Sequence, residues 1–229
     1  MEKIAIKELI EFRKKGSEKT KRNFALKLKT RKAKIKRLED KTSGGNYWSI
    51  SNSSIYNTFK HGTDDFYDDK IEEVVEKLHN ATSSKDKTMY ERNLDILRSF
   101  KEFDVLSLRP DDLINFETVE RNSKIITLQN LPIYINPNLV LLFEENGTET
   151  IGGIILVPQL NGFSKLELSL FCEILYKFLI EKYSDRYSIS QQYCIAIDTY
   201  NASSITFLEM INSRIPSILN TTLLEINSL

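Results

Sequence analysis

IYINPNLVLLFEENGTETIGGIILV, residues 133–157, is the stretch that decides the fold of this 229-residue chain. Two apolar runs, residues 133–144 and 149–157, stand on either side of the dipeptide Asn146-Gly147. Asn-Gly between two apolar runs is typical of a two-residue hairpin turn, because both residues tolerate the positive φ angles that the turn requires. The stretch therefore predicts an antiparallel β-hairpin.

The segments around the hairpin predict helices and further strands. Ser164-Lys165-Leu166-Glu167 matches a helix capping box, and an apolar helical pattern continues from it. From residue 86 onward the order is αβββαβ, so we predict a mixed sheet in which a crossover helix follows the hairpin. In chain order the predicted elements are helices at 4–15, 17–40, 52–60, 68–79 and 86–101, a strand at 124–129, the hairpin strands, a helix at 164–183, a strand at 192–199 and a helix at 203–219.

The predicted fold class is α+β, with a helical N-terminal region followed by a mixed β-sheet domain. Thr42-Ser43-Gly44-Gly45-Asn46 is a loop sequence and marks the first predicted boundary. We divide the chain into a basic helical arm (1–41), a helical connecting region (42–83) and an α/β mixed-sheet domain (84–229).

The composition favours a folded cytoplasmic protein. Hydrophobic residues make up 41% of the chain, which is enough for a substantial core. No apolar run approaches the roughly 20 residues that span a bilayer, and the first residues lack the apolar region of a signal peptide. Cys172 and Cys194 stand among apolar neighbours, so we interpret them as buried free thiols. No membrane association and no cofactor are expected.

Charge is distributed very unevenly along the chain, although the total is zero. Between Arg13 and Arg37 there are 13 Lys or Arg and one acid, Glu18, while the rest of the chain is acidic. Such asymmetry predicts an anionic partner for the arm. The residues that we assign to nucleic-acid binding are Arg22, Lys27, Lys29, Arg31, Lys32, Lys34, Lys36 and Arg37.

Three interpretations of the arm stay open. Lys and Arg on a helix bind the phosphates of DNA or RNA by releasing counterions, without reading the sequence. The same charges also suit an acidic protein surface, including that of a second copy, and a third interpretation is a solvated face with no partner. Tyr47 and Trp48 after the loop either stack on bases or anchor the loop to the core.

The element order, with the stretch Ile135-Asn136-Pro137-Asn138-Leu139-Val140, resembles the PD-(D/E)XK nuclease superfamily over about residues 86–200. The resemblance implies a Pro-Asp on the second strand and an acid and a lysine, two residues apart, on the third. In such enzymes the carboxylates hold Mg²⁺, which activates water. Here Asn138 follows Pro137, and residues 150–157 contain neither acid nor lysine.

The resemblance therefore implies a nuclease-like scaffold that has lost its metal site. We expect a non-catalytic nucleic-acid-binding protein, with a protein-interaction or self-assembly module as one alternative. The other alternative is a metal-dependent nuclease with a rearranged site drawn from Glu144, Glu149 and Lys165.

Two further places attract a functional interpretation. His61 precedes several aspartates, which suggests either a metal site or an acidic loop before a helix. Asp198 ends an apolar strand, where α/β sites gather, or else caps the loop after it. We favour the structural interpretation of both. No phosphate-binding glycine loop and no nucleophile motif is present in the sequence.

Overall fold

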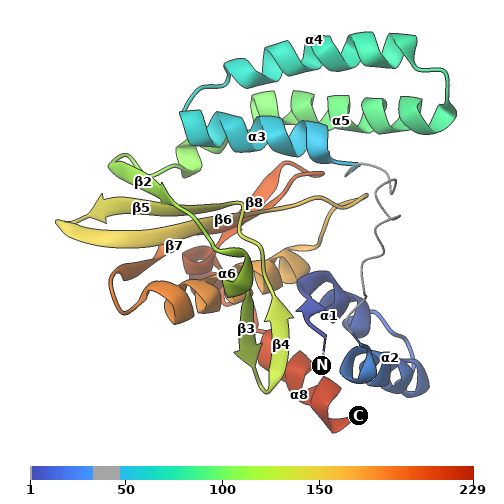
Figure 1. Ribbon diagram of the computed structural model, residues 1–229, viewed down its shortest axis with the longest axis vertical. Helices are drawn as coiled ribbons and strands as arrows, with labels where there is room; N and C mark the ends of the chain where they lie inside the picture. Colours follow the sequence, from blue (N-terminus) through green and yellow to red (C-terminus); the bar gives the residue numbers. More distant parts are fainter. Residues whose placement is uncertain (1, 33–46) are drawn as a thin grey trace.

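The computed structural model describes residues 2–32 and 47–229, and these form an α+β protein as predicted (Figure 1). The first elements are a two-residue strand and two short helices, which are followed by three helices. No helix in the described ranges is long and apolar enough to cross a bilayer. The bounds are β1 (Ile4–Ala5), α1 (Ile6–Arg13), α2 (Glu18–Thr30), α3 (Ser49–His61), α4 (Asp65–Asn80) and α5 (Ser84–Glu102).

The main sheet has the strand order β2-β5-β6-β7-β8. β6 and β7 are parallel and are joined by the crossover helix α6, while the other neighbours are antiparallel. A second, small sheet has the order β1-β4-β3. The bounds are β2 (Leu113–Glu117), β3 (Ile125–Leu128), β4 (Leu131–Tyr134), β5 (Leu139–Glu145), β6 (Thr148–Val157), α6 (Lys165–Tyr183), β7 (Ser188–Asp198), β8 (Ser203–Thr206), α7 (Phe207–Asn212) and α8 (Leu219–Ser228).

The predicted hairpin is confirmed. Glu145 of β5 pairs with Thr148 of β6, so the turn consists of Asn146 and Gly147 alone. Both have positive φ, 53° and 76°, which is the conformation that Asn-Gly supplies with little strain. The capping box is confirmed too, since the Ser164 hydroxyl accepts a hydrogen bond from the Glu167 N–H at 3.3 Å.

The hairpin strand β5 is apolar from Leu139 to Phe143 because both faces of the sheet are covered there, and its last two residues, Glu144 and Glu145, lie at the hairpin turn. Leu139, Leu141 and Phe143 pack with residues of α3, α4 and α5, whereas Val140 and Leu142 face the cluster that contains α6. Alternate side chains of a strand point to opposite faces, so a strand between two helical layers is apolar at every position. Figure 1 shows the resulting layers, with α3–α5 on one side of the sheet and α6 on the other.

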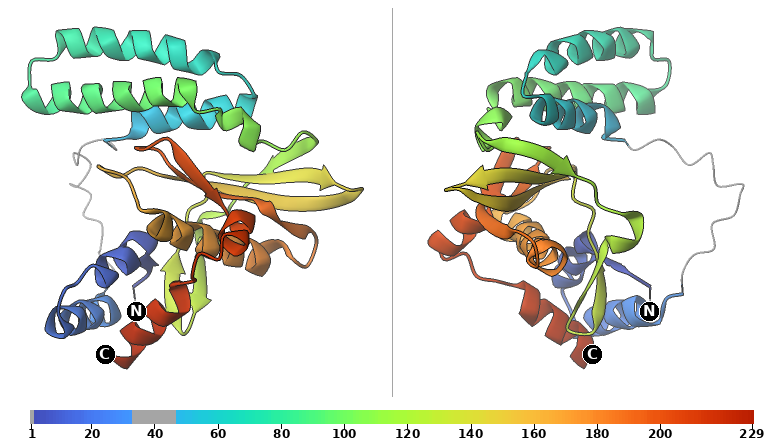
Figure 2. Two further views of the ribbon diagram at one scale, coloured as in Figure 1. Left: turned by 180° about the vertical axis from the view of Figure 1, so that it is seen from behind. Right: turned by 60° about the vertical axis from the view of Figure 1, so that its left-hand side comes forward.

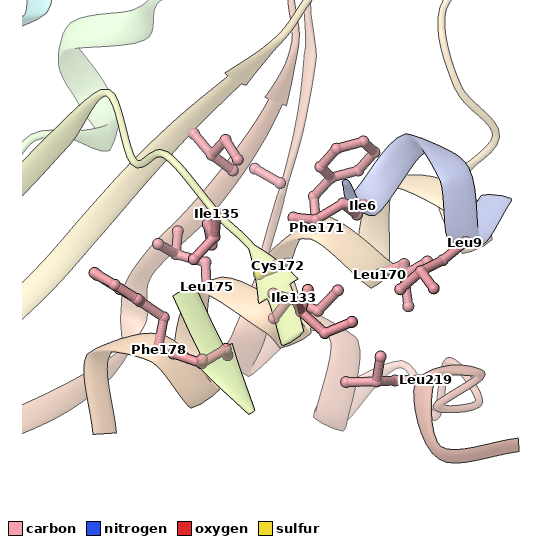
Figure 3. Close-up of a cluster of buried hydrophobic side chains, with 14 of the residues drawn as sticks. Ile6, Leu9, Ile133, Ile135, Leu170, Phe171, Cys172, Leu175, Phe178 and Leu219 are labelled. Atoms are coloured by element: carbon pink, nitrogen blue, oxygen red, sulfur yellow. The ribbon is translucent and has the colours of Figure 1, made fainter. Parts of the chain in front are cut away.

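The N-terminal helices belong to the larger of the two cores. Ile6 and Leu9 of α1 lie against α6 residues such as Leu170, and Leu219 of α8 closes the same cluster (Figure 3). Ile133 of β4 joins it from the small sheet. Residues 2–30 therefore dock on the sheet domain. The boundary that we predicted between 41 and 42 lies outside the described residues.

Several predicted elements differ from the structure. The strand at 124–129 is β3, which pairs with β4 in the small sheet, and the strand beside β5 in the main sheet is β2, which the sequence did not predict. The helix predicted at 203–219 is present only as α7, because residues 203–206 form β8, which pairs with β7 and buries Ile205, and residues 213–218 are not helical. The helix at 17–40 ends at Thr30, where Arg31 adopts extended backbone angles, and residues 33–40 lie outside the described ranges.

Candidate nucleic-acid interface

The helix α2 carries most of the described candidate residues, and local sequence explains its position. The Ser17 hydroxyl accepts a hydrogen bond from the Thr20 N–H at 3.3 Å and so caps the first turn. Ala25 and Leu28 are buried, and Phe24 packs against the same core. One side of α2 is thus fixed on the body of the protein and the other side faces solvent.

Three cations hold α2 in place. The Lys21 ammonium pairs with Glu225 of α8 at 2.6 Å, and Lys29 Nζ reaches the Asn227 carbonyl of the same helix at 3.4 Å. Arg31 donates to both carboxylate oxygens of Glu8. These cations are engaged within the chain, so their positive charge is already partly satisfied.

The Glu8–Arg31 pair shifts the pKa of both partners. Burial acts to raise the pKa of Glu8, but the hydrogen bonds from Arg31 and from the Ala5 N–H, with the charges of Arg31 and Lys27, outweigh it and lower that pKa. The hydrogen bond to Glu8 raises the pKa of Arg31. Both groups are therefore stabilised in their charged forms.

Four other cations of this region point into solvent. Lys19, Arg22, Lys27 and Lys32 are exposed. None of the four forms an ion pair with a carboxylate in residues 2–32 or 47–229. On a helix that rises 1.5 Å per residue, Lys19 and Lys27 are about 12 Å apart along the axis. Leu26, 54% exposed, lies on the same face.

Two shallow grooves border this face. Lys19 and Arg22 line a groove of 430 Å³ together with the end of α8. Lys27 lines a second groove, of 300 Å³, with Lys15 and Phe24. The ammonium of Lys15 lies 4.7 Å from the centre of the Phe24 ring. The second groove thus combines cations with an aromatic ring, a combination found in sites for single-stranded nucleic acid.

The eight residues that the sequence assigned to nucleic-acid binding fall into three groups. Arg22, Lys27 and Lys32 are exposed and available to a partner. Lys29 and Arg31 contact α8 and α1, so their side chains are engaged within the protein. The sequence-based assignment missed Lys19, which its spacing of three residues from Arg22 could have indicated. The remaining three, Lys34, Lys36 and Arg37, lie outside the described residues.

Tyr47 and Trp48 anchor the start of α3. Their rings meet edge to face with centroids 4.7 Å apart, and Trp48 also approaches the Tyr200 ring at 6.0 Å. The buried Asn93 of α5 donates to the Tyr47 carbonyl at 2.9 Å and accepts from the Ser51 N–H at 3.0 Å. These contacts support the anchoring interpretation over base stacking.

The residues that carry the nuclease resemblance are structural in this protein. Asn138 Oδ1 accepts from the Leu156 N–H at 2.8 Å, so the side chain links β5 to β6. Glu144 and Glu149 are directly opposite each other near the hairpin turn. Lys165 pairs with Glu209 at 2.5 Å, beyond the other end of β6.

Lys165 is remote from the two hairpin glutamates. Val157 lies eight positions after Glu149 in β6, which is about 26 Å of strand, and Lys165 follows that end of the strand. Glu144, Glu149 and Lys165 therefore do not converge on one site.

Asp198 caps the loop after β7, as the structural interpretation predicted. Its carboxylate is fully buried and accepts from the backbone N–H of Phe163 at 2.7 Å and of Tyr200 at 3.0 Å. The Asn201 side chain donates to it as well, at 2.9 Å. A carboxylate with this many donors holds two loops together.

The remaining candidate residues and the comparisons with known proteins give no functional assignment. Within the described ranges, no group of three His, Cys, Asp or Glu side chains is placed to hold a metal ion, and His61 lies beside the Phe66 ring. Cys172 and Cys194 are buried free thiols, as predicted. Comparison with protein-family models, with curated proteins and with solved structures finds no match to this chain.

Proposed function

We propose that this protein binds nucleic acid, without reading its sequence, through the exposed cations of α2 and through Lys32, which lies two residues beyond the end of that helix. The observation that carries the proposal is that some cations of this region are engaged within the protein whereas others are exposed and unpaired. Lys21, Lys29 and Arg31 fix the helix to its neighbours, and Lys19, Arg22, Lys27 and Lys32 stay unpaired on its outer side. Free cations on the exposed side of a helix that is fixed to its neighbours suit a phosphate backbone.

The mechanism is electrostatic, so its strength depends on salt. Each phosphate that is neutralised adds about −0.9 to the slope of log K against log salt for duplex DNA. The four free cations together give a slope of about −3.6, which corresponds to about a 150-fold loss of affinity between 50 and 200 mM salt. The grooves beside α2 leave room for the backbone to approach these side chains.

The test is fluorescence anisotropy of labelled DNA and RNA oligonucleotides at several salt concentrations. Arg22→Gln/Lys27→Gln removes two of the free cations, and the slope should fall in magnitude by about 1.8. The matched control is Lys85→Gln/Lys87→Gln, which removes two exposed cations of α5 and should leave the slope unchanged. If the test and control variants give equal slopes, α2 does not form the interface. If the protein does not bind either oligonucleotide at low salt, the proposal that it binds nucleic acid is wrong.

Self-association is the second candidate, and the charge of α4 favours it. α4 carries six acidic residues and two lysines, whereas α2 carries five cations and one acid. The two helices lie at opposite ends of the molecule (Figure 2), so α2 of one copy faces α4 of another in a head-to-tail contact. Light scattering of the unaltered protein and of the same variants distinguishes self-association from nucleic-acid binding. If the unaltered protein is a monomer at all protein concentrations, this contact does not form.

A further inference from the structure

The second groove beside α2 contains an aromatic ring, Phe24, that phosphate binding alone does not use. The α2 residues that line this groove of 300 Å³ are Thr20, Asn23, Phe24 and Lys27, and Lys15 lines it from the segment between α1 and α2. Residues three or four positions apart on a helix are neighbours, with about 5–6 Å between their Cβ atoms. The spacing of the four α2 residues therefore places them on one face of the helix.

One face of the Phe24 ring lies at the boundary with solvent. Phe24 is half-buried and packs against the larger core. The Lys15 ammonium lies over the ring, 4.7 Å from its centre, and pairs with Glu11 at 2.8 Å. The Glu11 side chain is 54% exposed, so this ion pair is a surface pair. The ring face beneath Lys15 is therefore the face that a ligand can reach.

Lys15 is held over the ring only weakly. An exposed ion pair between residues four positions apart contributes little, because water screens it, and a lysine side chain is flexible. The ammonium can therefore move from the ring to a phosphate of a ligand. This movement exposes an apolar ring face with two cations beside it, Lys15 and Lys27.

We propose that the α2 site binds single-stranded nucleic acid, with one unpaired base stacked on the Phe24 ring and neighbouring phosphates bound by Lys15 and Lys27. This inference rests on the proposed function and adds the class of nucleic acid. The bases of a duplex are paired and stacked on one another, so a half-buried ring reaches the face of a base only in an unpaired strand. Every base has such a face, so the contact does not depend on sequence.

The experiment is fluorescence anisotropy of the full chain at low salt with three labelled probes of equal length. The probes are a thymidine single strand, a single strand with abasic sugars throughout, and a duplex. The two single strands carry the same phosphates, so the difference between their affinities measures the contact with bases. Phe24→Leu keeps an apolar side chain against the core and removes the stacking surface. It should weaken binding of the thymidine strand about fivefold or more and leave the abasic strand and the duplex unchanged.

Two control variants separate stacking from a structural role of the ring. Phe24→Tyr keeps an aromatic face and should bind the thymidine strand like the unaltered protein. Phe116→Leu makes the same exchange at a half-buried ring of β2 and should change no affinity. If Phe24→Leu weakens binding of all three probes equally, or if Phe24→Tyr loses as much affinity as Phe24→Leu, the ring supports the helix and the stacking proposal is overturned.

Failure of this inference and failure of the proposed function give different results. If Phe24→Leu binds every probe like the unaltered protein while Arg22→Gln/Lys27→Gln still reduces the salt slope, the phosphate interface stands and base stacking is wrong. If the unaltered protein binds none of the three probes at low salt, both proposals are wrong.

Discussion

Replacing Arg31 with glutamine tests whether this residue anchors α2 or serves a ligand. Its guanidinium contacts both oxygens of Glu8 and the Lys3 carbonyl. The two side chains of the ion pair are 24% and 26% exposed, so solvent screens the pair only in part. Allowing for this screening, we expect Arg31→Gln to lower the free energy of unfolding by about 2 kcal/mol. For a chain of this size, that loss lowers the melting temperature by about 4–8 °C.

The pH dependence of this loss follows from the pKa of Glu8, which is lowered in the folded protein. A lowered carboxyl pKa contributes stability above the unfolded value, about pH 4, and that contribution disappears as pH falls through the folded value. The difference in melting temperature between the unaltered protein and the Arg31→Gln variant should therefore be largest at pH 7 and should shrink in more acidic solution.

Circular dichroism melts of both proteins across this pH range measure the effect. Lys32→Gln is the matched control, because it removes the neighbouring exposed cation and should change stability by less than about 0.5 kcal/mol. A double-mutant cycle with Glu8→Gln isolates the pair. If Arg31→Gln melts like Lys32→Gln, or if its deficit is the same in acid, Arg31 is not an anchor.

Two other buried carboxylates give predictions of opposite sign. Asp198→Ala leaves the Phe163 N–H and the Asn201 amide without their acceptor, so we expect a loss of about 3 kcal/mol in urea denaturation, and a loss below about 1 kcal/mol would contradict the capping role. Burial raises the pKa of Glu173, although the hydrogen bond from Ser217 opposes the shift. The folded protein disfavours the charged form of Glu173, so the Glu173→Gln variant should melt at a higher temperature than the unaltered protein at pH 7. Below about pH 4 both proteins should melt at the same temperature, because the carboxyl group is then protonated in the folded and unfolded states. A variant that melts at a lower temperature at pH 7 would refute this prediction.

Local signals in the sequence predicted the elements that local chemistry determines. The Asn146-Gly147 turn and the caps at Ser17 and Ser164 depend on residues within three positions of one another. β8 was missed because residues 203–206 form a strand only by pairing with β7. β2 was missed for a related reason, since it is an edge strand whose exposed residues, such as Ile114, give no alternating pattern.

The candidate interface was predicted as a region but not residue by residue. Charge counting locates the basic segment without structural information. It does not separate Arg22, which is free, from Arg31, which is paired, because Glu8 is 23 positions away from Arg31. The partner of Lys21, Glu225, is 204 positions away. Pairing over such separations depends on the tertiary fold.

The docking of the N-terminal elements has a consequence for the order in which the chain folds during synthesis. β1 pairs with β4, whose residues are made about 130 positions later, and α2 packs on α8, whose Glu225 is made 204 positions after Lys21. In a chain emerging from the ribosome, the N-terminal elements therefore dock in their final position only after α8 is available. Until then Lys21 lacks Glu225 and Lys29 lacks the Asn227 carbonyl, so the positive charge of this segment is less compensated in the nascent chain than in the folded protein.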